Sequence, residues 1–325
     1  MLTNREMGTN DVVSQAILRE GWSLHQRLTV APVDGTLAEG QALKNWRQIV
    51  APDTRENFEK RLEWDGLSTV AATWCLTPDD DAIPKSQPWW PWLEGLREAG
   101  RCASGVGREL ELANRASEHA FVHLWLPVAG WALNKLERQC GDLGQKLQVQ
   151  PSVWLDLGES LLERLCTTTD QALWELFNKR RTPGQMLLAH LGHDGDGEPM
   201  REAYEAFVGE IRHDGYAELL REYPVLGRLL ALVTEYWFEG CEETLRRIAE
   251  NRAGLEKSFS VSHEAQLASI QLGVSDPHRQ GRGVAILRFV SRNQEWKCLK
   301  QCRHVALCAK DCAVVREVCF RHLWA

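Results

Sequence analysis

The helical spacing of apolar residues that marks most of this 325-residue chain stops before Ser275, where a turn rich in glycine and arginine begins. The turn, residues 275–283, reads Ser-Asp-Pro-His-Arg-Gln-Gly-Arg-Gly, and an almost continuous apolar run follows it over residues 284–290. A short apolar run bounded by turn residues is typical of a buried strand. The sequence therefore predicts an α+β fold, predominantly α-helical, in which the first strand comes late in the chain.

Upstream of this turn, apolar residues recur three and four positions apart, which indicates helices with one buried face. The predicted helices cover residues 11–30, 43–50, 58–67, 119–136, 154–165, 172–178, 202–221, 223–237 and 241–259. The buried stripe of the helix that opens at Tyr223 is predicted to be Val225, Leu226, Leu229, Leu230, Val233 and Trp237. Four prolines between residues 77 and 92 indicate a loop whose tryptophan rings pack onto the helices.

The composition permits a sizeable core, with 44% hydrophobic and 26% charged residues. The net charge of −7 and the isoelectric point of about 5.9 argue against a general nucleic-acid-binding role. The N-terminus lacks an apolar signal region, and no apolar run reaches the roughly 18 residues that a membrane span requires. We therefore expect a cytoplasmic protein without nucleic-acid or membrane partners, whose ten cysteines are mostly thiols.

Two stretches of the helical part resemble metal sites, but both are incomplete. His119 and His123 stand four residues apart, which would place two ligands on one helical face, yet a zinc site needs a third or fourth ligand. Residues 190–198 resemble a calcium loop, but the sixth position counted from Asp194 is Pro199, where an EF-hand needs glycine. A solvated loop is the better interpretation of this second stretch.

The turn 275–283 carries the residue types that phosphate chemistry uses. Glycine lets the backbone approach an anion closely, and the side chains of His278 and Arg282 supply hydrogen-bond donors and positive charge. The plainer alternative is that Asp276 caps a turn, His278 lies on the surface, and the following strand belongs to an ordinary hairpin.

Four stretches, taken in order, give the chain a family resemblance. They are Arg-Leu-x-Trp-Asp-Gly-Leu within residues 58–67, Trp-Glu-Leu-Phe-Asn at 174–178, Tyr-Pro-Val-Leu-Gly-Arg-Leu-Leu at 223–230, and the Asp-x-His-x-x-Gly-Arg turn at 276–282. Together these stretches resemble the N-terminal dehydratase region of the class II lanthipeptide synthetases, the LanM enzymes.

The resemblance implies a helical N-terminal extension that leads into the first strands of a lipid-kinase-like N-lobe. We expect residues 1–270 to form the helical part, 271–295 to begin the kinase-like lobe, and 296–325 to be a divergent Cys-rich tail. Enzymes of this family phosphorylate Ser and Thr of a precursor peptide with ATP and Mg²⁺, and then eliminate the phosphate. Elimination needs a base for the α-proton and cations for the departing phosphate.

The resemblance assigns Asp276, His278 and Arg282 to the phosphate end of the active site, and the division of roles among them stays open. The family carries a Tyr-Lys-Pro-Arg segment on the next strand, whose lysine reaches the ATP phosphates. This chain reads Trp-Lys-Cys-Leu-Lys at 296–300, so that Lys297 is the candidate for this contact. A further departure is Ser275, which stands where the family has glycine.

The family's Asp-x-His-x-x-Asn catalytic loop, the metal-binding Asp that follows it, and the motifs of the zinc-dependent cyclase domain do not occur in the 325 residues. Because phosphoryl transfer depends on positioning and on charge neutralisation by metal ions, we expect these residues to be inactive on their own. The zinc of this family belongs to the cyclase domain.

Five of the ten cysteines lie at or after residue 298, and this tail has three interpretations. The pairs Cys298/Cys302 and Cys308/Cys312 are each four apart, so that two helical turns would bind zinc in a small regulatory protein. The second interpretation is a genuinely divergent sequence. The third is the product of a truncated or frameshifted gene, in which case strand 284–290 would lack part of its sheet and have an unpaired edge. A further alternative function is a non-catalytic helical module that binds a precursor peptide or a partner enzyme.

Overall fold

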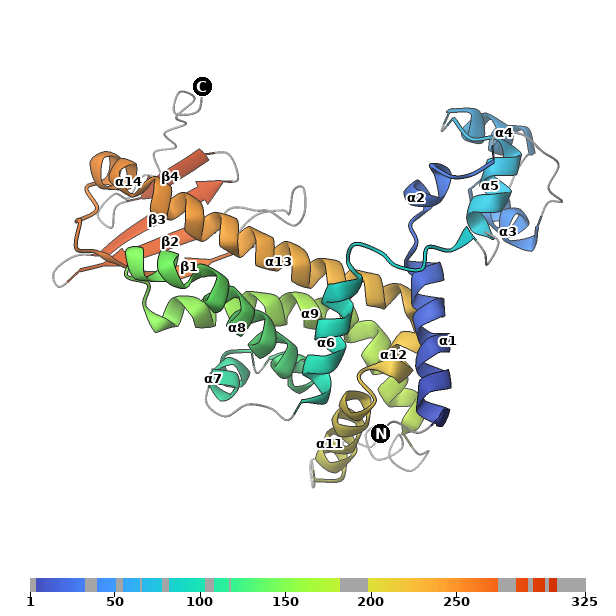
Figure 1. The fold of residues 1–325 in the computed structure, drawn as a ribbon, viewed down its shortest axis with the longest axis horizontal. Coiled ribbons are helices and arrows are strands. Elements are labelled where there is room, and N and C mark those ends of the chain that lie inside the picture. The colour runs from blue at the N-terminus through green and yellow to red at the C-terminus, as the bar shows by residue number, and fades with distance from the viewer. Residues whose placement is uncertain are drawn as a thin grey trace, which may run out of the picture. The chain divides into compact units, whose positions relative to one another are not determined.

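The computed structural model describes residues 4–32, 40–50, 55–64, 66–77, 82–102, 108–116, 118–181, 198–273, 285–291, 295–301 and 304–308. The chain forms two compact units, Met1–Pro88 and Trp89–Ala325, whose elements are drawn in Figure 1.

The first unit is helical. Its elements are α1 (Asn4–Gly21), α2 (Leu24–Leu28), α3 (Gln41–Val50), α4 (Arg55–Trp64) and α5 (Thr69–Leu76). One core cluster joins α3, α4 and α5 through Leu43, Phe58, Leu62 and Ala72, and the ring of Trp46 meets that of Phe58 edge-on. A second cluster contains Trp22, Trp74 and Cys75.

The single helix predicted over residues 11–30 is wrong, because Ser23 starts a new helix. Its side chain accepts a hydrogen bond from the backbone N–H of Gln26 at 3.3 Å, and the Gln26 side chain accepts one from the Ser23 N–H at 3.0 Å. In this reciprocal capping box, the two side chains accept from backbone N–H groups that have no carbonyl partner at the start of a new helix. The predicted end at Gly66 is confirmed, since α4 ends at Trp64 and Gly66 has a φ of 69°.

The second unit contains longer helices and a sheet. Its helices are α6 (Trp90–Arg101), α7 (Arg108–Arg115), α8 (Val122–Lys146), α9 (Pro151–Arg180), α11 (Glu198–His213), α12 (Ala217–Glu222), α13 (Pro224–Glu250) and α14 (Arg252–Phe259). Helices α8, α9 and α13 pack against one another. Buried tryptophans tie them together, because Trp125 donates to the Thr169 hydroxyl at 3.0 Å and Trp237 donates to the Leu157 carbonyl at 3.0 Å.

Several predicted helix boundaries in this unit are wrong. The segments 154–165 and 172–178 form one helix, α9. Thr169 lies between them and is buried, and its hydroxyl donates a hydrogen bond to the Leu165 carbonyl of the same helix, so this polar residue does not interrupt it. The predicted helix 202–221 is two helices, because Gly215 and Tyr216 both have a φ of 63°. Asp214 caps the second one by accepting from the N–H groups of Ala217 and Glu218 at 2.9 and 3.0 Å.

Helix α13 also differs from its prediction. It runs without a break through Cys241, where a new helix was predicted, and ends at Glu250. Leu226, Leu230 and Trp237 are buried as expected, whereas Val225 and Leu229 of the predicted stripe are 47% and 43% exposed. The loop predicted up to residue 92 ends earlier, since Trp90 already begins α6 with Pro91 in its first turn.

The strands are β1 (Gln266–Gln271), β2 (Ala285–Val290), β3 (Glu295–Gln301) and β4 (His304–Cys308), which form an antiparallel sheet in the order β1-β2-β3-β4. The sheet lies near the end of α13 that leads into α14 (Figure 1). The prediction that strand 284–290 has an unpaired edge is wrong, because β2 pairs with β1 on one side and β3 on the other. Cys298 and Cys308 lie in strands, so the helical turns predicted for them are wrong.

The predominantly helical α+β class is therefore confirmed. The relation of the sheet to a lipid-kinase-like lobe remains a prediction.

Candidate functional site

The residues predicted to handle phosphate lie in the connection between β1 and β2. The register pairs Gln271, the last residue of β1, with Ile286 near the start of β2. Asp276, His278 and Arg282 fall within this connection and lie outside the described residues. Lys297 lies in β3, where its backbone pairs with Arg288 of β2 and Cys308 of β4.

The hairpin that presents this connection is buried on one face. Leu267 and Ile270 of β1 and Leu287 and Phe289 of β2 are all at most 1% exposed. These pairs share a face because cross-strand partners in an antiparallel sheet point to the same side. A bulge between Leu267 and Ser269 adds Ala268 to the buried set.

The outer edge of β1 is closed by the N-terminal part of α9. The backbone N–H of Gln150, just before α9, donates to the Leu267 carbonyl at 2.9 Å, and the Ser152 hydroxyl donates to the Ala268 carbonyl at 2.7 Å. The Ile270 N–H donates to the Asp156 carboxylate at 3.2 Å. An edge strand normally leaves such groups unpaired, and here a helix satisfies them.

Arg252 of α14 closes the turn that leads into β1. Its guanidinium donates to the carbonyls of Ser262 at 3.0 Å and Ala265 at 2.7 Å, and lies 4.9 Å from the centre of the Phe289 ring. Because both ends of β1 are held to helices, the β1–β2 connection starts from a rigid support. Functional loops are commonly built on such supports.

One register position can be followed across all four strands of the sheet. The register aligns Ser269 of β1, Arg288 of β2, Lys297 of β3 and Cys308 of β4. Arg288 is exposed, while its neighbours Ile286 and Val290 on the same face are half-buried. Two residues of cationic type, Arg288 and Lys297, therefore occupy paired register positions on adjacent strands, and both residue types are common phosphate ligands in proteins. Sequence reasoning missed Arg288, since the pairing depends on the sheet register.

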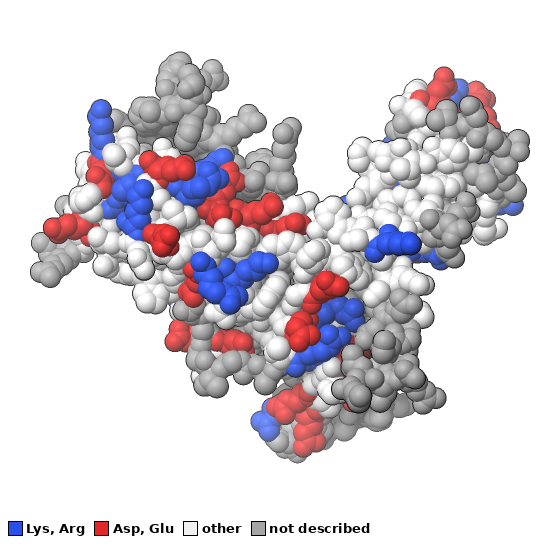
Figure 2. All heavy atoms as spheres, in the orientation of Figure 1, with Lys and Arg blue, Asp and Glu red and all other residues white. Residues whose placement is uncertain are grey.

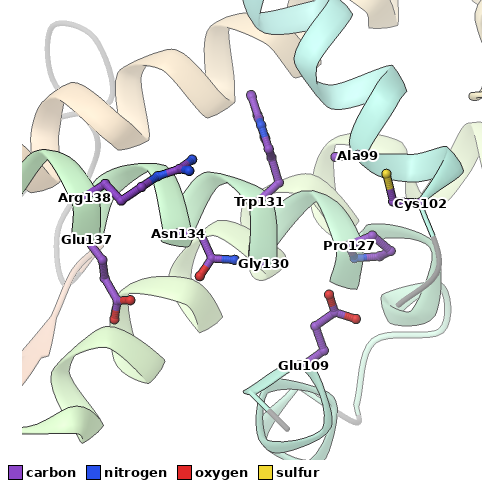
Figure 3. A pocket seen from close by; sticks show the side chains of 9 residues that line it. All are labelled: Ala99, Cys102, Glu109, Pro127, Gly130, Trp131, Asn134, Glu137 and Arg138. Atoms are coloured by element: carbon purple, nitrogen blue, oxygen red, sulfur yellow. The ribbon is translucent and has the colours of Figure 1, made fainter. Parts of the chain in front are cut away.

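A second feature of this unit is a cavity of about 670 Å³. It is lined by Ala99 and Cys102 of the α6 end, Glu109 of α7, and Pro127, Gly130, Trp131, Asn134, Glu137 and Arg138 of α8. Figure 3 shows the Glu109 carboxylate turned toward Pro127 and Gly130, with Glu137 and Arg138 at the opposite end. None of these residues was predicted as a site, because they come from three helices that no sequence motif connects.

Within the described residues, no three His, Cys, Asp or Glu side chains come together as metal ligands. His123 is exposed on α8 and its ring contacts that of Tyr204 edge-on at 6.1 Å. Cys75, Cys102, Cys140, Cys166 and Cys241 are free thiols.

The surface of the second unit carries both signs of charge. Figure 2 shows acidic and basic side chains interleaved on the face that it presents. Several of the charged side chains in this unit are paired with one another, as Arg180 is with Glu210 and Glu218, and Lys179 with Glu222. Among the helices of the described part, none is both long and apolar enough to cross a membrane.

Comparison with known proteins adds one match. Residues 223–295 match the family model described as "Domain of unknown function (DUF4135)", a domain found in lanthipeptide synthetases. The matched segment covers α13, α14, β1, β2 and the connection that holds Asp276, His278 and Arg282. No curated protein matches the chain.

Proposed function

We propose that this chain serves lanthipeptide biosynthesis as part of a LanM-type dehydration domain, which phosphorylates Ser and Thr of a precursor peptide with ATP and then eliminates the phosphate. The observation that carries this proposal is the DUF4135 match over residues 223–295, which contains the Asp-x-His-x-x-Gly-Arg turn. In this proposal Asp276, His278 and Arg282 act at the phosphate end of the active site, and Lys297 contacts the ATP phosphates.

The architecture around the turn supports this assignment. The turn joins two strands whose inner faces are buried, and α9 closes the edge of the first strand. The negative charge on a transferred or departing phosphate is stabilised best by hydrogen-bond donors that are already in position before the reaction. Donors that had to move first would lose part of the stabilisation energy to that movement. Lys297 and Arg288 occupy facing register positions in the same sheet.

The chemistry divides into two steps. Phosphorylation converts a Ser or Thr hydroxyl into a better leaving group: the hydroxyl oxygen bonds to the γ-phosphorus of ATP, the bond to the β–γ bridging oxygen breaks to release ADP, and the hydroxyl proton goes to a base. Elimination then removes the α-proton and releases inorganic phosphate as the C–O bond breaks. Mg²⁺ would neutralise charge on the nucleotide phosphates in the first step. The Asp-x-His-x-x-Asn motif does not occur in these 325 residues, so we expect them to bind nucleotide weakly and to show no turnover alone.

A chimeric enzyme tests the proposal directly. Residues 223–295 would replace the matching segment of a lanthipeptide synthetase, and mass spectrometry would follow phosphorylated and dehydrated forms of that enzyme's precursor peptide. We expect both products, and we expect the substitutions Asp276→Asn and His278→Ala to reduce them by at least about tenfold each. Lys257→Ala, an exposed lysine on α14, is the matched control and should leave both products unchanged.

The decisive negative result is a chimera that keeps the far-ultraviolet circular dichroism of the parent enzyme but forms neither product. That outcome would reject the proposed role of residues 223–295. If the chimera with unsubstituted residues 223–295 and its Asp276→Asn and His278→Ala variants gave equal product yields, only the assignment of these site residues would be rejected.

A further inference from the structure

The cavity beside α8 contains a carboxylate that the protein holds in place without a partner. The Oε2 atom of Glu109 is buried and has no hydrogen-bond partner among the described residues. Most buried polar atoms in folded proteins are hydrogen-bonded, and a buried one without a partner carries a desolvation cost of about 1–3 kcal/mol. Glu109 also lines the cavity, so a cationic ligand there that pairs with the carboxylate would offset part of this cost.

Close packing of α7 fixes the position of this carboxylate. A Cβ atom at Gly130 of α8 would lie 3.0 Å from Oε1 of Glu109, so the approach depends on glycine. One turn further along α7, the Leu112 side chain would lie 3.0 Å from a Cβ atom at Gly158 of α9. At the end of α7, Arg115 donates to Asp156 at 2.6 Å. These contacts hold α7, and with it Glu109, against α8 and α9.

The remaining lining has the character of a site for an organic cation with an apolar stem. Ala99, Pro127 and Trp131 supply apolar walls, and the Asn134 amide lies between the two charged ends (Figure 3). Gly130 and Arg138 both belong to α8, and their separation in the sequence corresponds to about 12 Å along the helix axis. The backbone of Arg138 is therefore far from Glu109, which lies against Gly130. The volume of about 670 Å³ exceeds that of one side chain, and lies within the usual range of ligand sites, about 300–1,000 Å³.

We propose that this cavity binds a lysine or arginine side chain of a peptide, whose ammonium or guanidinium group pairs with Glu109. The assignment to a precursor peptide rests on the proposed function. The ligand chemistry itself rests on the cavity: the anionic end takes the cation, and the apolar walls take the methylene stem.

Fluorescence anisotropy on the full chain tests this proposal. The probes are a labelled peptide with one arginine in a neutral Gly-Ser-Leu context and an identical peptide with glutamine in place of arginine. We expect the arginine peptide to bind at least about tenfold more tightly, the difference expected for one charge-assisted hydrogen bond. Glu109→Gln should abolish this preference, and Glu111→Gln, an exposed residue of the same helix, should keep it.

A second variant and a competition experiment complete the test. Gly130→Ala places a methyl group against Glu109, so it should weaken binding of the arginine peptide more than binding of the glutamine peptide. Thermal melts of all variants verify folding. Agmatine carries the same guanidinium group on a methylene stem, so it should compete with the arginine peptide for the cavity. Failure of agmatine to compete would overturn the pairing of the guanidinium group with Glu109.

Equal binding of both peptides, no binding of either one, or an unchanged preference in Glu109→Gln would each overturn the proposal. These outcomes are separable from failure of the proposed function, because the chimera experiment uses residues 223–295 and contains none of the residues that line the cavity.

Discussion

Asp156 of α9 accepts a hydrogen bond from the backbone N–H of Ile270 at 3.2 Å and so ties the edge of the sheet to the helical layer. Its other carboxylate oxygen accepts from Arg115 at 2.6 Å, which also raises the pKa of that guanidinium. One carboxylate thus joins α7, which carries Glu109, to β1, which leads into the proposed phosphate turn.

Replacing this carboxylate should destabilise the second unit. Asp156→Ala leaves the Ile270 N–H without its partner and frees Arg115, and we expect a loss of about 1–3 kcal/mol in unfolding free energy. Urea unfolding followed by circular dichroism measures it. Glu159→Ala is the control: it removes a 3.3 Å contact of Arg115 with a more exposed carboxylate, and should cost less than about 1 kcal/mol. Equal losses in both variants would contradict the bridging role of Asp156.

Gly100 and Gly141 form a second matched pair, since both are helical glycines with opposite surroundings. A Cβ atom at Gly100 would lie 2.2 Å from the ring of the buried Tyr216, whose hydroxyl donates to the Leu124 carbonyl at 2.8 Å. Gly100→Ala should therefore destabilise the protein by about 1–3 kcal/mol. Nothing lies within 4 Å of a Cβ atom at Gly141, so Gly141→Ala should stabilise the protein by about 0.5–1 kcal/mol. Thermal unfolding of the two variants would show shifts of opposite sign.

The described cysteines should differ in reactivity. Burial raises the pKa of Cys140 to about 11 and that of Cys166 to about 12, whereas Cys102 is exposed. Since the thiolate is the reactive form, brief treatment with iodoacetamide at pH 8 should label Cys102 and spare Cys140 and Cys166. Peptide mapping by mass spectrometry resolves each site. Rapid labelling of Cys140 in the folded protein would contradict the packing of α8.

The same raised pKa values predict a loss of stability at alkaline pH. An unfolded chain releases these thiol protons near the ordinary value of 9.0, while the folded protein keeps the Cys140 proton until about 11. The folded state binds more protons between these values, so unfolding free energy falls as pH rises through this window. A variant with Cys140→Ala and Cys166→Ala should be less stable at pH 7 because of two small cavities. Its stability should, however, fall less between pH 9 and pH 11, which urea unfolding at several pH values would measure.

Arg288 should contribute to nucleotide binding if the sheet face carries the phosphate contacts. Arg288→Ala removes the cation that faces Lys297 in the register, and we expect the affinity for a fluorescent ATP analogue with Mg²⁺ to fall by about tenfold. Lys257→Ala on α14 is again the control. An unchanged affinity in Arg288→Ala, with a reduced one in Lys297→Ala, would limit the contact to Lys297.

Local sequence signals located several features correctly. The stop of α4 before Gly66 follows from the left-handed backbone that glycine adopts freely, and the strand at 284–290 follows from its apolar run between turn residues. The starts of α2 and α12 were missed, although Ser23 and Asp214 are capping residue types. A cap competes with continued helix, and the apolar pattern on either side favoured continuation.

The sequence by itself determined the helical character of the chain, the position of β2 and the residue types of the proposed phosphate turn. Only the tertiary structure decided that α9 closes the edge of β1, that Arg288 faces Lys297, and that Glu109 lies unpaired against Gly130. The physical reason is that periodicity and capping act over a few residues, whereas these contacts join segments far apart in the chain. Such contacts exist only once the helices and strands have packed, because each one depends on the register and close approach of elements that share no local signal.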